Sequence, residues 1–324
     1  MRGKLHTAAR KHRAHKGSLS RNRNGLIQRN TIAKGSKTSR KIIGSRKRTD
    51  RGTVGNQQFQ HGYERGYTSG VNQGVESFAE PFHGTSIIIP TYNQADYLIQ
   101  CITSIEAHTT DPYEIIVVDN GSSDHTGQYL QQRVGQIRFK QLETNRGFAG
   151  GVNQGLMMAK GDSIVILNND TLVTPRWLSN MLRCLYSDST IGVVGPVTNY
   201  ISGEQQIQVP YDAVPQMWAF AEQHNVPDES RWSKADRLVG YCLLFRRELL
   251  KSTGYFDEGF EIGNYEDEDW MIRVRLSGRE LVIAGDTFIH HYGSVSMKNL
   301  GQQKFEVVHE QNGTFYEQKW GKST

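Results

Sequence analysis

At 324 residues the chain is long enough for one large catalytic domain with a sizeable core. Its formal net charge of +5 is unevenly distributed: residues 1–51 hold 17 of the 38 Lys and Arg and one acid, whereas the chain from Gly84 onward carries 20 basic and 29 acidic residues. The basic character therefore belongs to the N-terminal segment and excludes nothing about an active site in the acidic remainder.

Cysteine spacing and hydropathy indicate the cellular compartment. Cys101, Cys184 and Cys242 are far apart and show no CxxC or Cys/His spacing, which favours buried free thiols in a reducing compartment. No apolar run approaches the roughly 18 residues needed to span a bilayer, and the N-terminus has no apolar signal-peptide core. We expect a cytoplasmic protein, peripheral at a membrane or another anionic surface if its basic segment binds one.

Residues 1–83 have the composition of a tail and linker. Residues 1–52 combine few large apolar residues with like-charge repulsion, which predicts disorder. Such a tail is either solvated or in contact with an anionic surface, nucleic acid or acidic protein. Glycines four apart at 62, 66, 70 and 74 favour either a self-associating helix or a flexible linker. A folded domain is expected over residues 84–324.

From Thr85 onward, short apolar runs alternate with helical periodicity. Buried strands are predicted at "SIIIP", "YEIIVVDN", "IRFKQLE" and "DSIVILNND", and helices at "QADYLIQCITSIEAH" and "GFAGGVNQGLMMAKG". This alternation predicts an α/β, Rossmann-like fold with a mostly parallel central sheet covered by helices on both faces. Ligands should bind at the carboxyl ends of the strands.

Polar loops follow the first strands. "PTYNQ" and "VVDNGSSDHT" place Thr91, Tyr92, Asn93 and Asp119 at one edge of the sheet, where they are candidates to hold a base and ribose, although each loop alone also reads as a turn with a helix cap. "ETNRGFAGGVNQG" puts glycines at a helix start, where N–H groups can face a phosphate, or where glycine simply allows close packing.

Acidic residues and histidines follow the later strands. Asp170, after Asn168 and Asn169, suits a hard divalent cation that bridges phosphate oxygens, or caps the helix expected near Pro175. Four acids at 266–269 begin another helix, where dipole stabilisation explains one or two of them, and their crowding favours either a general base or nearby positive charge. His290 and His291 end the last strand and are candidate metal or phosphate contacts.

In order, these blocks resemble the inverting glycosyltransferases of family 2, with the GT-A fold, over about Thr85 to Ser296; a rhamnosyltransferase-like subgroup is one interpretation. The resemblance implies hexosyl or deoxyhexosyl transfer from a UDP, dTDP or GDP sugar to a glycan, lipid-linked or protein acceptor. "NND" takes the place of the family's DxD motif, so Asp170 is the implied ligand of Mg²⁺ or Mn²⁺, and His290 matches the family's late histidine. The implied donor-binding residues are Pro90, Thr91, Tyr92, Asn93, Asp119, Asn145, Gly147, Asn153, Asn168 and Asn169.

The implied catalytic base is Asp267, beside Glu266, with Asp269 as its competitor because "EDED" contains two overlapping copies of the motif. Trp177 and Trp270 are candidates for the acceptor side, and acceptor choice is expected to depend on residues 199–236. Two alternatives are a sugar-nucleotide pyrophosphorylase, whose usual glycine-rich loop with Arg and Lys is missing, and a catalytically inactive transferase-like module carried by a polyanion-binding tail. Salt-sensitive nucleic-acid binding without sugar turnover would favour the latter.

Overall fold

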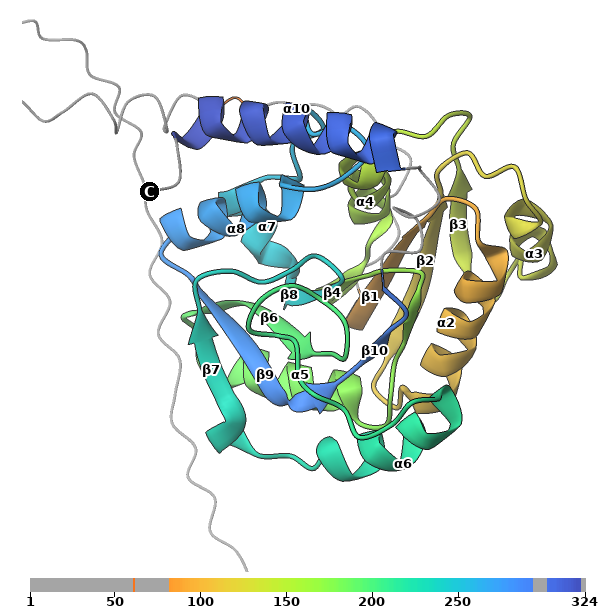
Figure 1. Cartoon of the computed structure of the whole chain (residues 1–324). Coiled ribbons are helices and arrows are strands. Elements are labelled where there is room, and N and C mark those ends of the chain that lie inside the picture. The colour runs from red at the N-terminus through yellow and green to blue at the C-terminus, as the bar shows by residue number, and fades with distance from the viewer. Residues whose placement is uncertain (1–60, 62–81, 294–301, 322–324) are drawn as a thin grey trace, which may run out of the picture. The chain divides into compact units, whose positions relative to one another are not determined.

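The computed structural model describes residue 61 and residues 82–293 and 302–321 (Figure 1). The chain divides into two compact units, residues 1–48 and 49–324, and every described residue belongs to the second. The disorder expected for residues 1–52 and the glycine repeat at 62–74 lie outside the described residues. Within these ranges, none of the helices has the length and apolar character that crossing a bilayer requires.

An eight-stranded sheet forms the centre of the described domain, in the order β3-β2-β1-β4-β8-β6-β9-β7. Strands β1, β2, β3 and β4 are mutually parallel, β6 and β9 are parallel, and β8 and β7 run antiparallel to their neighbours. The strands are β1 (Phe82–Thr91), β2 (Tyr113–Asp119), β3 (Arg138–Gln141), β4 (Gly161–Leu167), β6 (Ile191–Val197), β7 (Trp232–Ala235), β8 (Cys242–Arg246) and β9 (Glu280–Phe288). Two short strands, β5 (Thr171–Leu172) and β10 (His290–His291), pair antiparallel in a separate ribbon.

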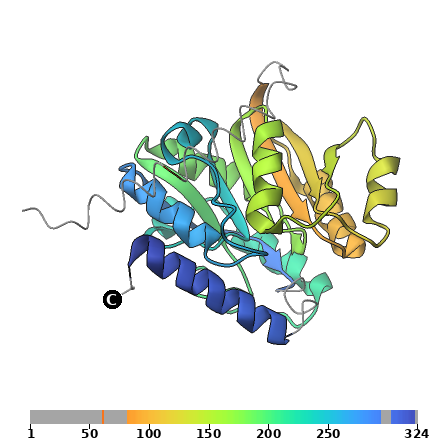
Figure 2. The same ribbon diagram turned by 90° about the horizontal axis from the view of Figure 1, so that it is seen from above.

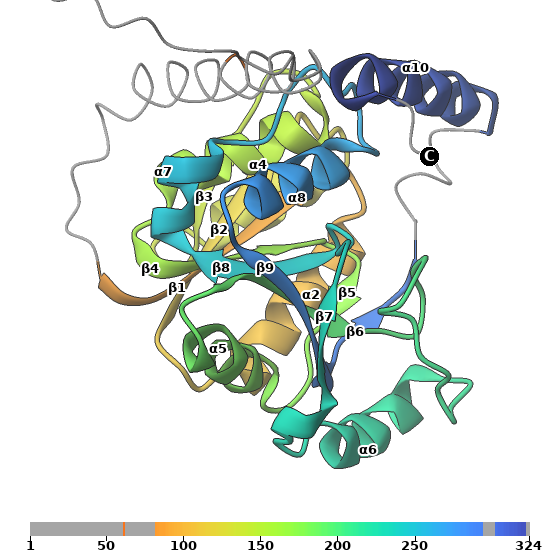
Figure 3. The ribbon, with the colours of Figure 1, turned by 90° about the vertical axis from the view of Figure 1, so that its left-hand side faces the viewer.

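Helices cover both faces of this sheet, as Figure 3 shows for α4, α7 and α8 on one side and α2 and α5 on the other. The helices are α2 (Ala95–His108), α3 (Thr126–Gln132), α4 (Gly147–Met158), α5 (Trp177–Ser187), α6 (Val214–His224), α7 (Leu250–Thr253), α8 (Glu266–Leu276) and α10 (Gln302–Trp320), with 3₁₀ turns at Glu229–Arg231 and Arg247–Leu249. The α/β fold with a largely parallel sheet, as predicted, is confirmed.

Alternating side chains along the strands build two cores. Ile87 and Ile89 of β1 point toward α2 and α5, whereas Ile88 points toward α4. Gly155 of α4 permits this second contact, because a Cβ there would lie 2.2 Å from the Ile88 side chain. All three cysteines are free and buried.

Three features of the C-terminal half were not expected. Strand β8 enters the sheet antiparallel between β4 and β6, and β7 forms the edge beside β9. Helix α10 lies alongside α8 (Figure 2), although its sequence is polar and contains Gly313. Local hydrophobic periodicity shows neither the direction in which a strand pairs with its neighbours nor the tertiary contacts that hold a polar helix in place.

Candidate active site

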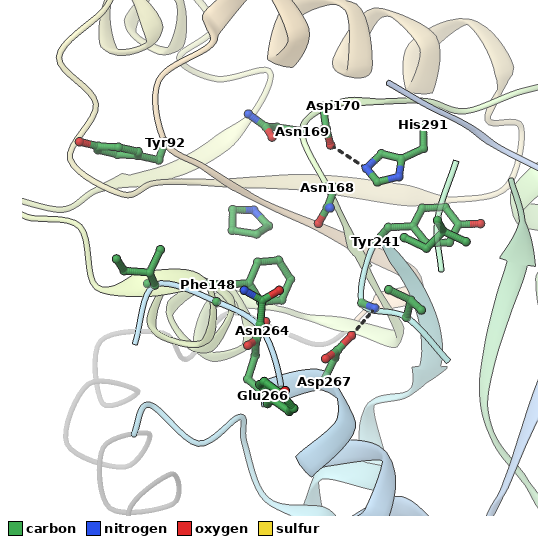
Figure 4. A pocket seen from close by; sticks show the side chains of 18 of the residues that line it. Tyr92, Phe148, Asn168, Asn169, Asp170, Tyr241, Asn264, Glu266, Asp267 and His291 are labelled. Carbon is green, nitrogen blue, oxygen red and sulfur yellow. Dashed lines mark hydrogen bonds and ion pairs between the residues drawn. The ribbon is translucent and has the colours of Figure 1, made fainter. Parts of the chain in front are cut away.

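The described residues line a cavity of about 1280 Å³ at the carboxyl ends of β1 and β4. The loop after β1 contributes residues 90–94 and the loop after β4 contributes residues 168–170. Residues 262–268, from α8 and the loop before it, form the opposite side (Figure 4). The predicted location at the ends of the parallel strands is therefore where the cavity lies.

The loops after β1 and β2 hold each other in place. Asn93 and Gln94 have left-handed backbones with φ of 57° and 63°. The Asn93 side-chain oxygen accepts the Ser123 N–H at 2.8 Å, and the Ser122 hydroxyl accepts the Asn93 N–H at 2.7 Å. These bonds fix the backbone beside Tyr92, which lines the cavity and is 42% exposed.

Asp119 lies behind this lining. It is buried and accepts hydrogen bonds from the Ser122 N–H at 2.9 Å and the Gln141 amide at 3.2 Å. It is not among the residues that line the cavity, so its described role is to support the loop. A direct contact of Asp119 with the donor stays a prediction.

The expectation that Asn153 contacts the donor is corrected by its position. Its amide nitrogen donates to the Phe256 carbonyl and the Glu258 carboxylate, both at 2.9 Å, while its oxygen accepts the Phe256 N–H at 3.0 Å. Asn153 is buried and does not line the cavity. Its amide therefore fastens α4 to the segment that leads into the loop before α8.

The first N–H groups of α4 are hydrogen-bonded within the protein and do not face a phosphate. The Gly147 N–H donates to the Asn145 side chain at 2.9 Å, and the Phe148 N–H donates to the Ile262 carbonyl at 2.8 Å. Gly147 has a φ of +74° and a Cβ there would lie 2.9 Å from Ile262 N. Asn145 and Gly147 do line the cavity. Glycine is required at position 147 because its φ is positive and the backbone of Ile262 lies too close for a side chain.

The Asn-Asn-Asp segment is held tightly beneath the cavity. Asn169 donates to the Thr91 hydroxyl at 2.9 Å, and the Asn168 N–H donates to the Tyr241 carbonyl at 2.8 Å. Asp170 is buried, and α5 begins after Arg176 with no side-chain cap. The alternative in which Asp170 caps that helix is therefore wrong.

His291 is the histidine that meets Asp170. Its Nε2 lies 3.2 Å from Asp170 Oδ1, and its ring stacks on Tyr241 at 5.4 Å between centroids (Figure 4). Its Nδ1 lies 2.8 Å from the Tyr200 carbonyl oxygen. Because a carbonyl can only accept, Nδ1 carries the proton, and in the neutral ring Nε2 presents a lone pair.

His290 lies elsewhere, which corrects the sequence-based choice between the two histidines. Side chains alternate along β10, so His290 points away from the cavity and its Nδ1 lies 2.7 Å from the Tyr211 hydroxyl. Burial, with a smaller contribution from His291, lowers the pKa of His290 to about 4. It is therefore uncharged near neutral pH.

The Asp170 and His291 pair fits a divalent cation. A neutral Nε2 and a carboxylate oxygen are both electron-rich, and Nε2 makes no hydrogen bond in the structure. Oxygen and imidazole ligands suit Mn²⁺ and are compatible with Mg²⁺, and a backbone carbonyl on Nδ1 orients a metal-binding histidine. Within the described ranges no third His, Cys, Asp or Glu completes a protein-only site, so other ligands would have to come from substrate or water.

Glu266 and Asp267 face this pair from the first turn of α8. The Asp267 carboxylate accepts the Gly240 N–H at 2.8 Å and the Glu268 N–H at 2.9 Å. Burial raises the pKa of Asp267, and those two N–H groups act against the rise. Burial and the neighbouring Asp267 raise the pKa of Glu266 well above its usual value, and Glu266 Oε2 has no hydrogen-bond partner.

Asp269, the sequence-based competitor for the base, is enclosed in the protein. It is fully buried, and Arg273 donates to its Oδ2 from Nε at 3.1 Å and from a terminal nitrogen at 2.8 Å. Lys319 Nζ lies 2.6 Å from its Oδ1, which also accepts the Trp320 indole N–H at 2.9 Å. Asp269 does not line the cavity, so it cannot reach an acceptor there.

The two tryptophans expected on the acceptor side are core residues. Trp177 is fully buried and donates its indole N–H to the Thr109 hydroxyl at 3.0 Å. Trp270 is fully buried against Phe245 and Phe256, with ring centroids 4.7 and 5.0 Å away. Both expectations are wrong because the apolar faces of α5 and α8 turn these side chains into the two cores.

Tyr200, from the stretch 199–236 expected to govern acceptor choice, lines the cavity, but sequence reasoning missed four other lining residues: Arg237, Gly240, Tyr241 and His309. Gly240 is the most informative, because a Cβ there would lie 3.1 Å from Asp267 Cβ and 3.3 Å from its Oδ2. No local signal marks a glycine that makes room for a side chain 27 residues away. For His291 the signal was present, because alternation along a strand places only one histidine of the pair on the cavity side.

Comparison with known proteins identifies the family. The sequence profile of Glycosyl transferase family 2 matches residues 86–254. The chain is 30% identical over 208 residues to glycosyltransferase GlyG of Streptococcus pneumoniae serotype 4 (strain ATCC BAA-334 / TIGR4), covering 62% of this chain and 68% of that protein. It is 27% identical over 225 residues to chondroitin synthase of Pasteurella multocida (strain Pm70), covering 60% of this chain and 23% of that protein.

Among solved structures, GalNAc-T7 with UDP, GalNAc and Mn²⁺ superposes with a TM-score of 0.52 at 18% identity, covering 66% of this chain and 44% of that one. At this identity the likeness speaks to the fold, which is that of a GT-A glycosyltransferase. The chain belongs to glycosyl transferase family 2, and its class of reaction is sugar transfer.

Proposed function

We propose that residues 84–324 transfer a sugar from a nucleoside-diphosphate sugar to an acceptor hydroxyl with inversion, with Asp267 as general base and a divalent cation at Asp170 and His291. The observation that carries the proposal is the facing arrangement of these groups across one cavity. Asp170 and His291 lie on one side and Asp267 on the other (Figure 4).

The choice between the two neighbouring acids rests on their surroundings. Both Asp267 oxygens accept backbone N–H groups, which favour the ionised carboxylate. Glu266 lacks a partner at Oε2, and burial together with the neighbouring Asp267 raises its pKa, which favours its protonated form. Two adjacent carboxyl groups whose environments separate their pKa values suit different roles, and the ionised one is the base.

The donor would lie along the ends of β1 and β4. Tyr92 and the loop at residues 90–94 form the outer end of this lining, and Asn168 and Asn169 form the floor next to Asp170. A divalent cation bound there would neutralise negative charge on the diphosphate leaving group. A solved structure of similar fold that contains UDP, GalNAc and Mn²⁺ supports this choice of ligands.

Asp267 would take the proton from the acceptor hydroxyl as that oxygen attacks the anomeric carbon from the side opposite the diphosphate. One displacement of this kind inverts the configuration. The two N–H groups on Asp267 hold its carboxylate in place, so little reorganisation is needed during proton transfer. General-base catalysis contributes roughly 10²–10⁴-fold to the rate.

The test uses the full chain and a panel of UDP, dTDP and GDP sugars, with Mn²⁺, Mg²⁺ or chelator. We expect one donor to bind and to release nucleoside diphosphate only with metal. Asp170→Ala should abolish this release. Asp162→Ala is the matched control, because Asp162 is partly exposed at the opposite end of β4 and pairs with His83.

Metal-independent release, or equal loss in both variants, would contradict the metal assignment. Failure of every donor to bind to the folded protein would favour the alternative hypothesis, in which the domain is a catalytically inactive binding module carried by its basic tail. Salt-sensitive binding to a polyanion such as heparin, without sugar turnover, would then be the expected behaviour.

A further inference from the structure

The cavity has a second wall that the proposed donor contacts do not use. Tyr200 lines it next to His291, and Arg237, Glu268 and His309 line it near the start of α8. At about 1280 Å³, the cavity exceeds the roughly 300–1000 Å³ of a typical single-ligand site. The volume and the unused wall together indicate room for a second ligand beside Asp267.

Helix α10 fixes part of this wall. The Asn312 side chain donates to the carbonyls of Glu261 and Gly263, both at 2.9 Å, and accepts the Glu261 N–H at 3.1 Å. Lys319 bridges two buried carboxylates, Asp257 at 2.7 Å and Asp269 at 2.6 Å. These contacts tie α10 to the segment that leads into α8, and so to Asp267.

His309 is presented from this anchored helix. Its ring lies 5.1 Å from the ring of Tyr265, the residue just before α8, and it lines the cavity while remaining exposed. Helix α10 lies outside residues 86–254, the part of the chain matched by the family profile. His309 therefore belongs to a part of the wall that this profile does not cover.

The charge of this wall selects against an anion. On this side of the cavity lie the carboxyl groups of Asp267 and Glu268, together with Glu266, which holds its proton, and Arg237 is the one Lys or Arg among the described lining residues. Arg237 is already paired with Glu268 at 3.1 Å, next to Glu266 and Asp267. At an effective dielectric constant of about 20, a negative charge about 6 Å from an ionised carboxylate weakens binding by about a hundredfold.

The chemistry of the wall suits a sugar ring instead. Tyr200 lines the cavity with 45% of its surface exposed, and aromatic faces pack against the apolar faces of ring ligands while their polar edges stay hydrated. Arg237, Glu268 and His309 supply both donors and acceptors to hydroxyl groups. Arg237, the one Lys or Arg among the described lining residues, already pairs with Glu268, so a negative charge on the acceptor would have no free guanidinium there to compensate it.

We propose that Tyr200, Arg237, Glu268 and His309 form an acceptor subsite for an uncharged carbohydrate, completed by the C-terminal helix. This inference rests on the proposed function, because it names the acceptor class of the same site. Hydroxyl-bearing acceptors whose reacting end carries a phosphate or carboxylate are disfavoured.

The experiment uses the donor identified above and p-nitrophenyl glycosides as acceptors. Neutral glucoside, galactoside, N-acetylglucosaminide and rhamnoside are compared with the glucuronide and with glucoside 6-phosphate. We expect transfer to at least one neutral glycoside and at least about tenfold lower kcat/KM for the charged ones. In Glu268→Gln, the kcat/KM for glucuronide relative to glucoside should rise about tenfold.

His309→Ala tests the wall formed by α10. Loss of one hydrogen-bonding contact should raise the KM for the neutral acceptor about fivefold, while the Kd for the donor changes less than twofold. His125→Ala is the matched control, since His125 is half-exposed next to α3 and does not line the cavity. Tyr200→Ala should likewise raise the KM for the acceptor.

Several outcomes would overturn the inference. These are charged glycosides used as well as neutral ones, no acceptor accepted while metal-dependent donor release persists, or an unchanged acceptor KM in both wall variants. A donor Kd weakened as much as the acceptor KM would make His309 a structural residue. Absence of donor turnover would instead defeat the proposed function, and the acceptor subsite with it.

Discussion

The buried lysine at the end of α10 offers a quantitative test of how strongly α10 stabilises α8 and the segment before it, which carry Asp267. Lys319 is 5% exposed, and its Nζ lies 2.7 Å from Asp257 Oδ2 and 2.6 Å from Asp269 Oδ1. Removal of one partner from a buried ion pair costs about 3–5 kcal/mol, because a desolvated charge is left behind. Asp269 keeps Arg273 and Trp320, so we expect Lys319→Met to cost about 3 kcal/mol, the lower end of that range.

Chemical denaturation with urea measures this loss directly, and the melting temperature should fall by roughly 6–12 °C. Lys234→Met is the matched control, because Lys234 is 75% exposed and its pair with Glu280 should contribute less than about 1 kcal/mol. Asp257→Asn added to Lys319→Met should recover more than about 1 kcal/mol by neutralising a buried acid that has lost its lysine. Equal, small losses in Lys319→Met and Lys234→Met would refute the reasoning.

Three further predictions concern the wall around Asp267. Asp267→Asn should lower the rate of transfer by about 10²–10⁴-fold while the Kd for the donor is unchanged. In the wild type, kcat/KM should fall as the pH falls through the pKa of Asp267, which burial raises above the value of about 4 typical of aspartate. A flat pH profile would contradict the assignment of Asp267 as the base. The raised pKa of Glu266 means that the folded chain keeps a proton that the unfolded chain loses near pH 4–5, so the free energy of unfolding should decrease as pH rises from there toward that pKa, by up to about 1.4 kcal/mol per pH unit. Glu266→Gln should show a smaller decrease, because only the raised pKa of Asp267 then contributes among the two, and parallel curves in urea unfolding between pH 5 and 8 would count against this prediction. Gly240→Ala should displace the Asp267 carboxylate by a few tenths of an ångström and lower kcat about tenfold with unchanged donor binding, and kinetics equal to the wild type would show that Asp267 adapts.

The parallel half of the fold could be predicted because its strands are continuous apolar runs. Ile87, Ile88 and Ile89 are all fully buried, as expected for a strand covered on both faces. The C-terminal half could not be predicted in the same way, since the antiparallel direction of β8 depends on which neighbours remain available in the sheet. Helix α10 escaped notice because Asn312 and Lys319, its anchors, are polar residues that become buried only through distant partners.

The candidate site was predictable where residues follow strands and unpredictable where contacts join distant segments. The loop at residues 90–94 and the Asn-Asn-Asp segment lie on the cavity as expected, whereas Asn153, Trp177 and Trp270 are occupied inside the protein. Local sequence shows which residue types are present but not which way a helix turns them. The functional roles assigned to the lining residues stay predictions until the variants above are measured.

The tie between α10 and the segment that precedes α8 also bears on the order of events during synthesis. Within residues 257–264, Asn312 holds two carbonyls and Lys319 holds the Asp257 carboxylate, and both anchors lie about 50 to 60 positions later in the chain. The parallel strands and the Asn-Asn-Asp loop can assemble on a growing polypeptide, but the wall that carries Asp267 is completed only after residues 302–320 have been made. A nascent chain would therefore form the donor side before its catalytic acid is locked in place, so competence for transfer would come as one of the last steps of folding.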